Sequence, residues 1–246
     1  MKVNDFCNMV KRASRYGSTG TTADQPATDI LNSINLRRKR IWAKWNWPWA
    51  LTALSETLVA GTTEYTLTTK VDRITDLYIV DNSVSPNEIE GPLKQCTRQD
   101  FLRWVATGTQ TNGIPDKYIN LGLASTGYWQ VKINPPPQAS LLLKGWGKKI
   151  LATYTSADLV ANTDFDYFPD GIIEDVLWDG VLSDACRIQG ETDEAARLDM
   201  SFEHKLKLLV QEQAGAATDD TAIASPVPDG YRWKKQQRSK YGTGNY

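Results

Sequence analysis

The change from helical to strand periodicity, which decides the fold, takes place at Leu36-Arg-Arg-Lys-Arg-Ile-Trp-Ala-Lys-Trp-Asn-Trp-Pro-Trp49. This stretch carries five cations and four tryptophans: Arg37, Arg38, Lys39, Arg40, Lys44, Trp42, Trp45, Trp47 and Trp49. Such a composition fits a nucleic-acid-binding stripe, a helix on a membrane surface or the end of a helix that packs in a core. The sequence on either side has to distinguish these hypotheses.

The pattern before the stretch predicts a helix from about Pro26 to Trp45. Asp24 is a suitable N-cap, and Pro26 fits the first turn because its missing N–H is not needed there. At 100° per residue the large apolar side chains share an arc of roughly 120°: Ala27, Ile30, Leu31, Ile34, Ile41, Trp42 and Trp45. Most of the cations lie outside this arc or at its edge. We therefore expect Trp42 and Trp45 in a helical core and most of the charge in solvent.

Arg38 is the exception, because it falls inside the apolar arc. A buried arginine requires a carboxylate partner, and Asp184 falls on the apolar side of a later predicted helix. We expect these two residues to pair. The helix should end before Pro48, which disfavours helical geometry in the residue before it. Trp47 and Trp49 are then expected to form the corner into the first strand.

The composition excludes several classes of protein. The chain has 246 residues, nine tryptophans, 41% hydrophobic residues and a net charge of -1, so it can build a core and is not a general polyanion binder. Its three cysteines are far apart without a C-x-x-C pair, which argues against a disulfide framework or a zinc ribbon. No apolar run reaches the ~18–20 residues of a membrane span, and no signal peptide is evident. We expect a soluble protein made in a cytoplasm.

Strand periodicity replaces helical periodicity from about residue 49 to residue 155. Short alternating runs separated by turn residues cover 58–67, 74–80, 117–123, 128–133 and 140–146. A short helix capped by Thr97 interrupts them. Runs at this spacing predict a small antiparallel β-sandwich or barrel.

Helical periodicity returns after Phe168 and continues to about Gln213. Gly180 and Ser183 on the apolar side permit a close helix approach, and Gly190 is expected to separate two helices. The sequence therefore predicts an α+β fold: an antiparallel α-helical bundle with an inserted β domain and an extended C-terminal arm. The expected boundaries are 1–48 for the N-terminal helices, 49–155 for the β insertion, 156–214 for the C-terminal helices and 215–246 for the arm.

The arm combines cations with aromatic residues and has no acid from residue 231 onwards. The residues that we consider for binding are Tyr231, Arg232, Trp233, Lys234, Lys235, Arg238, Tyr241 and Tyr246. They could track phosphates and stack on bases, or anchor the arm in grooves of a partner protein. A disordered, solubilising tail is the third alternative.

No catalytic, cofactor-binding or metal-binding pattern is evident. His204, the single histidine, has no nucleophile beside it in the sequence. The acidic stretch 162–170 lacks the Gly and Glu that an EF-hand loop requires. A carbohydrate-active β domain has only the abundance of tryptophan in its favour. We therefore expect no enzyme, no cofactor and no metal.

The order of several short motifs resembles the head-to-tail adaptor, or neck and connector-ring, proteins of tailed bacteriophages. The motifs are Ile41-Trp-Ala-Lys-Trp-Asn-Trp-Pro-Trp49, Val59-Ala-Gly-Thr-Thr-Glu-Tyr65, Arg73-Ile-Thr-Asp-Leu-Tyr78, Gly113-Ile-Pro-Asp-Lys-Tyr118, Val131-Lys-Ile-Asn-Pro-Pro-Pro137 and Tyr167-Phe-Pro-Asp170. Pro92-Leu-Lys94 and Asp100-Phe101 fall between the third and the fourth, and the helix pair 172–213 closes the order. The resemblance covers residues 25–214.

The resemblance implies a structural virion protein of the neck. Such proteins form a homo-oligomeric ring, commonly of twelve copies, beneath the portal protein, where they extend the channel for the packaged DNA and receive a tail or nozzle protein. The arm would then grip the portal. The cations Arg37, Arg40 and Lys44 would contact a neighbouring subunit or the DNA channel. A nucleic-acid-binding protein that uses residues 37–44 and the arm is the alternative.

Overall fold

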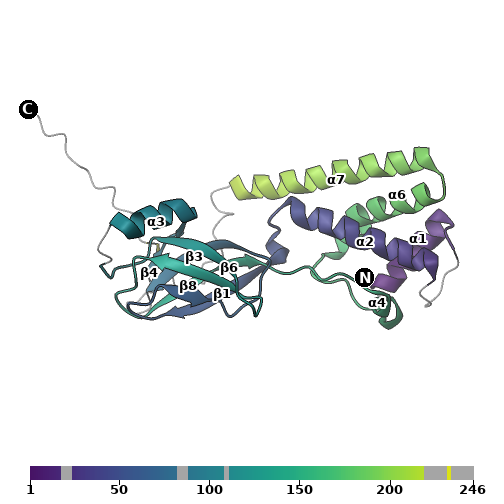
Figure 1. Ribbon diagram of the computed structural model, residues 1–246. Coiled ribbons are helices and arrows are strands. Elements are labelled where there is room, and N and C mark those ends of the chain that lie inside the picture. Colours follow the sequence, from purple (N-terminus) through teal and green to yellow (C-terminus); the bar gives the residue numbers. More distant parts are fainter. Residues whose placement is uncertain (18–23, 82–87, 108–110, 219–231, 234–246) are drawn as a thin grey trace, which may run out of the picture. The chain divides into compact units, whose positions relative to one another are not determined.

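The computed structural model describes residues 1–17, 24–81, 88–107, 111–218 and 232–233. The chain divides into two compact units. One, called the α unit below, comprises Met1–Leu51 and Lys149–Ala224. The other, called the β unit, comprises Thr52–Lys148 and Ser225–Tyr246. Figure 1 shows the helices of the first unit and the strands of the second.

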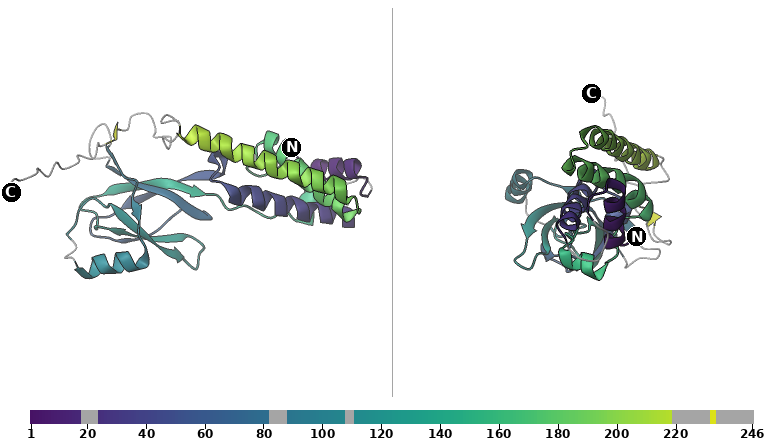
Figure 2. Two further views of the ribbon diagram at one scale, coloured as in Figure 1. Left: turned by 90° about the horizontal axis from the view of Figure 1, so that it is seen from above. Right: turned by 90° about the vertical axis from the view of Figure 1, so that its right-hand side faces the viewer.

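The α unit is built from four main helices and several short helical segments. The main helices are α1 (Val3–Ser14), α2 (Gln25–Lys44), α6 (Trp178–Ile188) and α7 (Thr192–Thr218). The short segments are η1 (Pro48–Ala50), α4 (Ser156–Ala161), α5 (Asp170–Ile172) and η2 (Ile173–Leu177), the last being a π-helix that leads directly into α6. In both figures α7 runs alongside α2 and α6 (Figures 1 and 2).

The side chain of Asp24 links α1 to α2 by contacting both helices. Its Oδ1 accepts a hydrogen bond of 2.8 Å from the backbone N–H of Ala27, which confirms the predicted N-cap. The same oxygen lies 2.8 Å from Nζ of Lys11, a buried residue of α1. The ion pair explains how Lys11 is buried, since a buried charge requires a partner.

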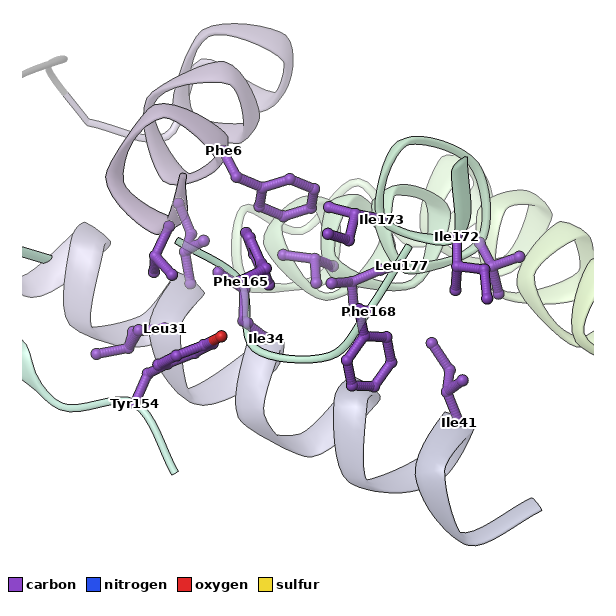
Figure 3. Close-up of a cluster of buried hydrophobic side chains, with 14 of the residues drawn as sticks. Phe6, Leu31, Ile34, Ile41, Tyr154, Phe165, Phe168, Ile172, Ile173 and Leu177 are labelled. Atoms are coloured by element: carbon purple, nitrogen blue, oxygen red, sulfur yellow. The ribbon is translucent and has the colours of Figure 1, made fainter. Parts of the chain in front are cut away.

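The core of the α unit draws its side chains from all four main helices and from the segment before α5. Figure 3 shows Phe6 of α1, Ile34 of α2 and Leu177 of η2 around Phe165. Phe6 and Phe165 meet edge to face, with ring centroids 5.5 Å apart. Tyr154 also belongs to this core, so residues just after the β unit pack with the helices.

The predicted close approach at Gly180 is confirmed. A Cβ at this position of α6 would lie 2.9 Å from Cδ2 of Phe202 on α7 and 3.0 Å from Cδ of Arg37 on α2. Ser183, one turn further on, is buried and donates a 2.7 Å hydrogen bond to the carbonyl of Ala195. The small residues Gly180 and Ser183 therefore allow α2 and α7 to pack closely against α6.

The β unit contains two sheets. The first has the strand order β1-β8-β3-β4-β9, formed by β1 (Leu51–Leu58), β8 (Leu141–Lys148), β3 (Arg73–Asp81), β4 (Glu88–Glu90) and β9 (Arg232–Trp233). The second has the order β2-β7-β6-β5, formed by β2 (Glu64–Thr66), β7 (Trp129–Asn134), β6 (Lys117–Leu123) and β5 (Lys94–Gln95). The pairs β4–β9 and β5–β6 are parallel, and β3–β4, β3–β8, β2–β7 and β6–β7 are antiparallel.

One hydrophobic cluster contains residues from both sheets: Leu54, Leu58, Leu67, Val71, Leu77, Ile79, Leu93, Tyr118, Val131, Ile133, Leu141 and Leu143. The helix α3 (Arg98–Thr107) begins at the predicted cap, where Oγ1 of Thr97 accepts a hydrogen bond from the N–H of Asp100 at 3.2 Å. Figure 2 shows α3 outside the strands. A Cβ at Gly145 of β8 would collide with the carbonyl of Asp76, at the point where the β3–β8 register shifts. Gly145 therefore permits this irregularity.

The expected mixed α+β class is confirmed, with two mostly antiparallel sheets. Among the described residues neither sheet closes into a barrel. The helix α4 and the π-helix η2 were not anticipated. A capping box at Thr155 and Asp158 stabilises α4, in which the backbone N–H of Thr155 donates a 2.7 Å hydrogen bond to Oδ2 of Asp158.

Candidate functional site

A network of charges joins α2, α6 and α7 in the α unit, and Arg37 is at its centre. The Arg37 guanidinium donates from Nε to Oδ2 of Asp184 at 2.9 Å and from Nη2 to Oδ1 at 2.6 Å. Its third nitrogen, Nη1, donates to Oδ1 of Asp199 at 2.6 Å. Only 4% of Arg37 is exposed. A buried, bidentate arginine–carboxylate pair is among the stronger polar contacts in proteins.

Other side chains complete the surroundings of Asp184. The Ser33 hydroxyl donates a short hydrogen bond to Oδ2, and Nη1 of Arg187 lies 3.3 Å from Oδ1. Burial raises the pKa of the Asp184 carboxyl, but the hydrogen bonds from Arg37 and Ser33 outweigh burial and leave the pKa below its ordinary value. Burial likewise opposes protonation of Arg37, yet its two carboxylate partners raise its pKa overall. Asp184 and Arg37 therefore stabilise each other as ions.

The predicted pairing of Arg38 with Asp184 is wrong. Both Arg37 and Arg38 are buried, but they leave α2 in different directions because neighbouring helical positions differ by about 100°. Arg37 points toward α6 and α7, where Asp184 and Asp199 lie. Arg38 points toward the chain around Tyr154. The helical pattern identified Arg38 as buried but could not identify its neighbour.

Aromatic rings rather than a carboxylate surround Arg38, which is 0% exposed. Its guanidinium carbon lies 3.9 Å from the centroid of the Tyr154 ring and 5.3 Å from that of Phe168. Nη1 donates to the carbonyl of Ala152 at 3.3 Å. In the part of the chain that the structure describes, its Nε and Nη2 have no hydrogen-bond partner. Burial lowers the pKa of Arg38, and the cation–π contacts offset part of the desolvation.

The lowered pKa of Asp184 gives an expected dependence of stability on pH. Its folded-state pKa lies below the unfolded value of about 3.9, so the ionised carboxylate stabilises the folded protein above that pH. The contribution disappears as the pH falls through the folded-state pKa. We expect Asp184→Asn to be clearly less stable than the wild type near neutral pH, with the difference shrinking below pH 4. Urea unfolding of both proteins from neutral pH to below pH 4 measures the difference in their free energy of unfolding. A difference that stays constant with pH would contradict the stabilising role of the ionised Asp184 carboxylate.

A shallow depression of about 550 Å³ opens above this network and has a basic rim. Its lining residues are Leu36, Arg37, Lys39, Arg40, Asp184, Arg187 and Asp199. Leu36 is 64% exposed at this rim. Arg40 is half-exposed and lies 2.8 Å from Oε1 of Glu203 on α7.

Arg37, which was expected at a subunit or DNA-channel contact, is buried within the chain and engaged by Asp184 and Asp199. Lys44 is exposed as expected, and Arg40 keeps an exposed face beside Glu203. Lys39, which was not among the expected contacts, is exposed at the depression. For Lys39 and Lys44 no ion pair occurs within the described residues.

The tryptophans of the opening stretch lie in or against the core of the α unit. Trp47 is 0% exposed, and its indole Nε1 donates a 2.8 Å hydrogen bond to the carbonyl of Ile41 at the end of α2. The Trp47 ring stacks on Trp49, with centroids 5.7 Å apart and planes 11° from parallel. Trp42 is buried beside Trp49, and Trp45 is half-buried. Trp47 thus ties the segment after α2 to the end of that helix within the α unit.

Of the arm residues, the structure describes only Arg232 and Trp233, whose backbone forms β9. The expected arm contacts at Tyr231, Lys234, Lys235, Arg238, Tyr241 and Tyr246 lie outside the described residues.

Three residues that complete the charge network were not predicted from the sequence: Ser33, Asp199 and Glu203. Asp199 and Glu203 are four residues apart on α7, and each faces a cation of α2. This spacing, which puts both acids on one face of a helix, was the signal in the sequence that could have identified them. Among the described residues no group of three or more His, Cys, Asp or Glu is placed to hold a metal, and none of the described helices is long and apolar enough to cross a membrane.

A family model for the SU10 adaptor protein matches residues 2–227 of the chain. The match begins before α1 and extends beyond α7, so it adds residues 2–24 and 215–227 to the range that the motif resemblance covers, and it does not include residues 228–246. Among curated proteins, none matches the chain.

Proposed function

The chain belongs to the SU10 adaptor protein family, and we propose that it forms a ring beneath the portal protein that joins the capsid vertex to the tail. The resemblance to bacteriophage head-to-tail adaptors is thereby confirmed at the level of the family. The family match over residues 2–227 is the observation that carries the proposal. In this role the protein acts as a structural component of the virion neck and not as an enzyme.

The finer architecture is part of the proposal. The α unit serves as an antiparallel bundle, and the β unit serves as an inserted sandwich, because one core cluster contains residues of both sheets. The expected segments 1–48, 49–155, 156–214 and 215–246 describe the order of these parts along the chain. The structure supports somewhat narrower limits for the β insertion, since Tyr154 packs in the core of the α unit.

A closed ring requires two different surfaces on each copy that fit each other. The depression on the α unit supplies features of one such surface. Leu36 is an exposed apolar side chain, and Lys39 and Lys44 are exposed cations near it in the sequence. Interfaces combine apolar contacts at the centre with polar groups at the rim. We assign Leu36, Lys39, Arg40 and Lys44 to the contact with the next copy or to the wall of the DNA channel, with twelve copies as the expected number.

The basic arm is proposed to attach the ring to the portal. Its aromatic residues are suited to fill pockets on a partner, and its cations favour an acidic surface. A tail or nozzle protein would bind the ring on its other side. The protein would be made in the host cytoplasm and become part of the virion.

Removing residues 231–246 is expected to abolish co-sedimentation with portal assemblies. The full chain should pellet with purified portal, and the truncated chain should stay in the supernatant while keeping the circular dichroism spectrum of a folded protein. Unchanged co-sedimentation of the truncated chain would show that the arm is not the attachment. Failure of the full chain to pellet with portal would count against the adaptor role.

The alternative function is binding of nucleic acid, favoured by the exposure of Lys39 and Lys44. Binding dominated by phosphate contacts weakens about 10³–10⁵-fold between 50 and 200 mM salt when six to ten contacts are made. A monomer that bound DNA tightly with such a salt dependence would favour this alternative over the adaptor.

A further inference from the structure

The strand β4 is paired along both of its edges, by β3, which precedes it in the chain, and by β9, which lies far from it in the sequence. On one side it pairs with β3 in antiparallel register, with Val80 opposite Ile89. On the other side β9 pairs with it in parallel register, with Arg232 beside Glu88 and Trp233 beside Ile89. We propose that the outer edge of β4 is a docking site for the C-terminal segment of the same chain. The dipeptide Arg232-Trp233 is the part of that segment that binds.

An apolar cluster on the β3–β4 sheet favours this docking. Tyr78, Val80 and Ile89 are buried together, with Leu142 and Trp146 packed against them. They form a cluster separate from the main core of the β unit, which takes Leu77 and Ile79 from β3. Since successive strand residues alternate between faces, the two clusters occupy opposite faces of the sheet. Positions 80, 89 and 233 are paired across the three neighbouring strands β3, β4 and β9, and paired positions lie on the same face of a sheet.

Charge also favours the C-terminal segment at this edge. The chain carries Asp81, Glu88 and Glu90 on β3 and β4, whereas residues 231–246 contain five cations and no acid. An open edge strand offers a row of backbone donors and acceptors to any extended segment. Strand addition obtains affinity from these backbone bonds and specificity from side chains beside them. A basic segment whose tryptophan is at the position paired with Ile89 suits both the charge and the apolar character of this edge.

The docking would hold the start of the remaining arm, residues 234–246, at the edge of β4. The thirteen residues 234–246 follow the paired dipeptide directly. Fully extended, they reach at most about 43–47 Å. A partner that binds the end of the arm must therefore lie within that distance of β4. This consequence holds whether or not the partner is the portal.

Hydrogen–deuterium exchange on the full chain tests the docking. We expect the double variant Arg232→Pro/Trp233→Pro, which lacks both N–H groups of β9, to speed exchange of β4 amides by about tenfold or more. The matched control Gln237→Pro, which lies outside the paired dipeptide, should leave β4 unchanged. Amides of β2, in the other sheet, should be unchanged in both variants. Equal β4 exchange in the wild type and the double variant would overturn the proposal.

A disulfide trap identifies the occupant. In a Cys96→Ser background, which removes the one free cysteine that is not buried, Glu88→Cys and Arg232→Cys are combined because the two positions are paired in the register. We expect rapid oxidation to a disulfide within one chain, seen as a monomer by mass spectrometry. The control pair Thr66→Cys/Arg232→Cys, with Thr66 in β2, should remain reduced. Disulfides only between chains would assign the site to a second copy, and absence of any disulfide would reject docking; either result overturns the proposal.

Discussion

Replacing Arg37 by methionine is expected to lower the free energy of unfolding of the α unit by about 3–5 kcal/mol. The change removes the bidentate partner of Asp184, which is only 17% exposed, and one partner of Asp199. Arg187 remains near Asp184 but lies 3.3 Å away and is itself half-exposed. The free energy of unfolding therefore falls by a large amount, because the buried Asp184 carboxylate loses its bidentate cationic partner.

A double-mutant cycle separates this pair from its surroundings. Adding Asp184→Leu to Arg37→Met should recover much of the loss, since replacing both members of a buried pair with apolar residues can be nearly neutral. Urea unfolding followed by far-ultraviolet circular dichroism measures all four proteins. The exposed pair Arg40–Glu203 serves as the control, and its removal should cost about 1 kcal/mol or less. Additive effects of Arg37→Met and Asp184→Leu would show that the two residues are not coupled.

Replacing Trp47 by alanine is expected to lower the free energy of unfolding by about 3–5 kcal/mol. Trp47 is fully buried, stacks on Trp49 and donates its indole N–H to the carbonyl of Ile41. Alanine would leave a cavity and an unpaired carbonyl at the end of α2. The segment after α2 would lose the side chain that packs it into the core of the α unit.

Two further variants sharpen this result. Trp47→Phe should cost less than Trp47→Ala, since the ring is kept and only the hydrogen bond, worth about 1 kcal/mol, is removed. Trp45→Ala should also cost less, because Trp45 is half-buried. Thermal and urea unfolding of the three variants give the comparison. A loss at Trp47 no larger than that at Trp45 would contradict the role of Trp47.

Local signals in the sequence predicted most elements of the fold. The cap at Asp24, the cap at Thr97 and the left-handed Gly190 each act on their immediate neighbours, and all three occur in the structure. The strand at 117–123 was predicted from alternation alone and has the same limits in β6. Hydrophobic periodicity also placed Arg38 in the buried arc of α2, where it is fully buried.

The partners of buried charges could not be predicted from the same signals. A helical arc shows which side of α2 is buried, but α2 is buried against α6 and α7 on one side and against the chain around Tyr154 on another. Arg37 and Arg38 differ by one position and face these different neighbours. Asp184 is close to Arg37 only because Gly180 lets α6 approach α2. Such long-range packing leaves no trace in periodicity.

The central claim, that the protein is a ring-forming adaptor, is tested most directly by negative-stain electron microscopy. The purified chain is imaged alone and after mixing with purified portal. We expect closed rings around a central pore that stack coaxially on the portal, with twelve copies in each ring. Particles that remain single copies in both samples, with no density added to the portal, would contradict the adaptor assignment.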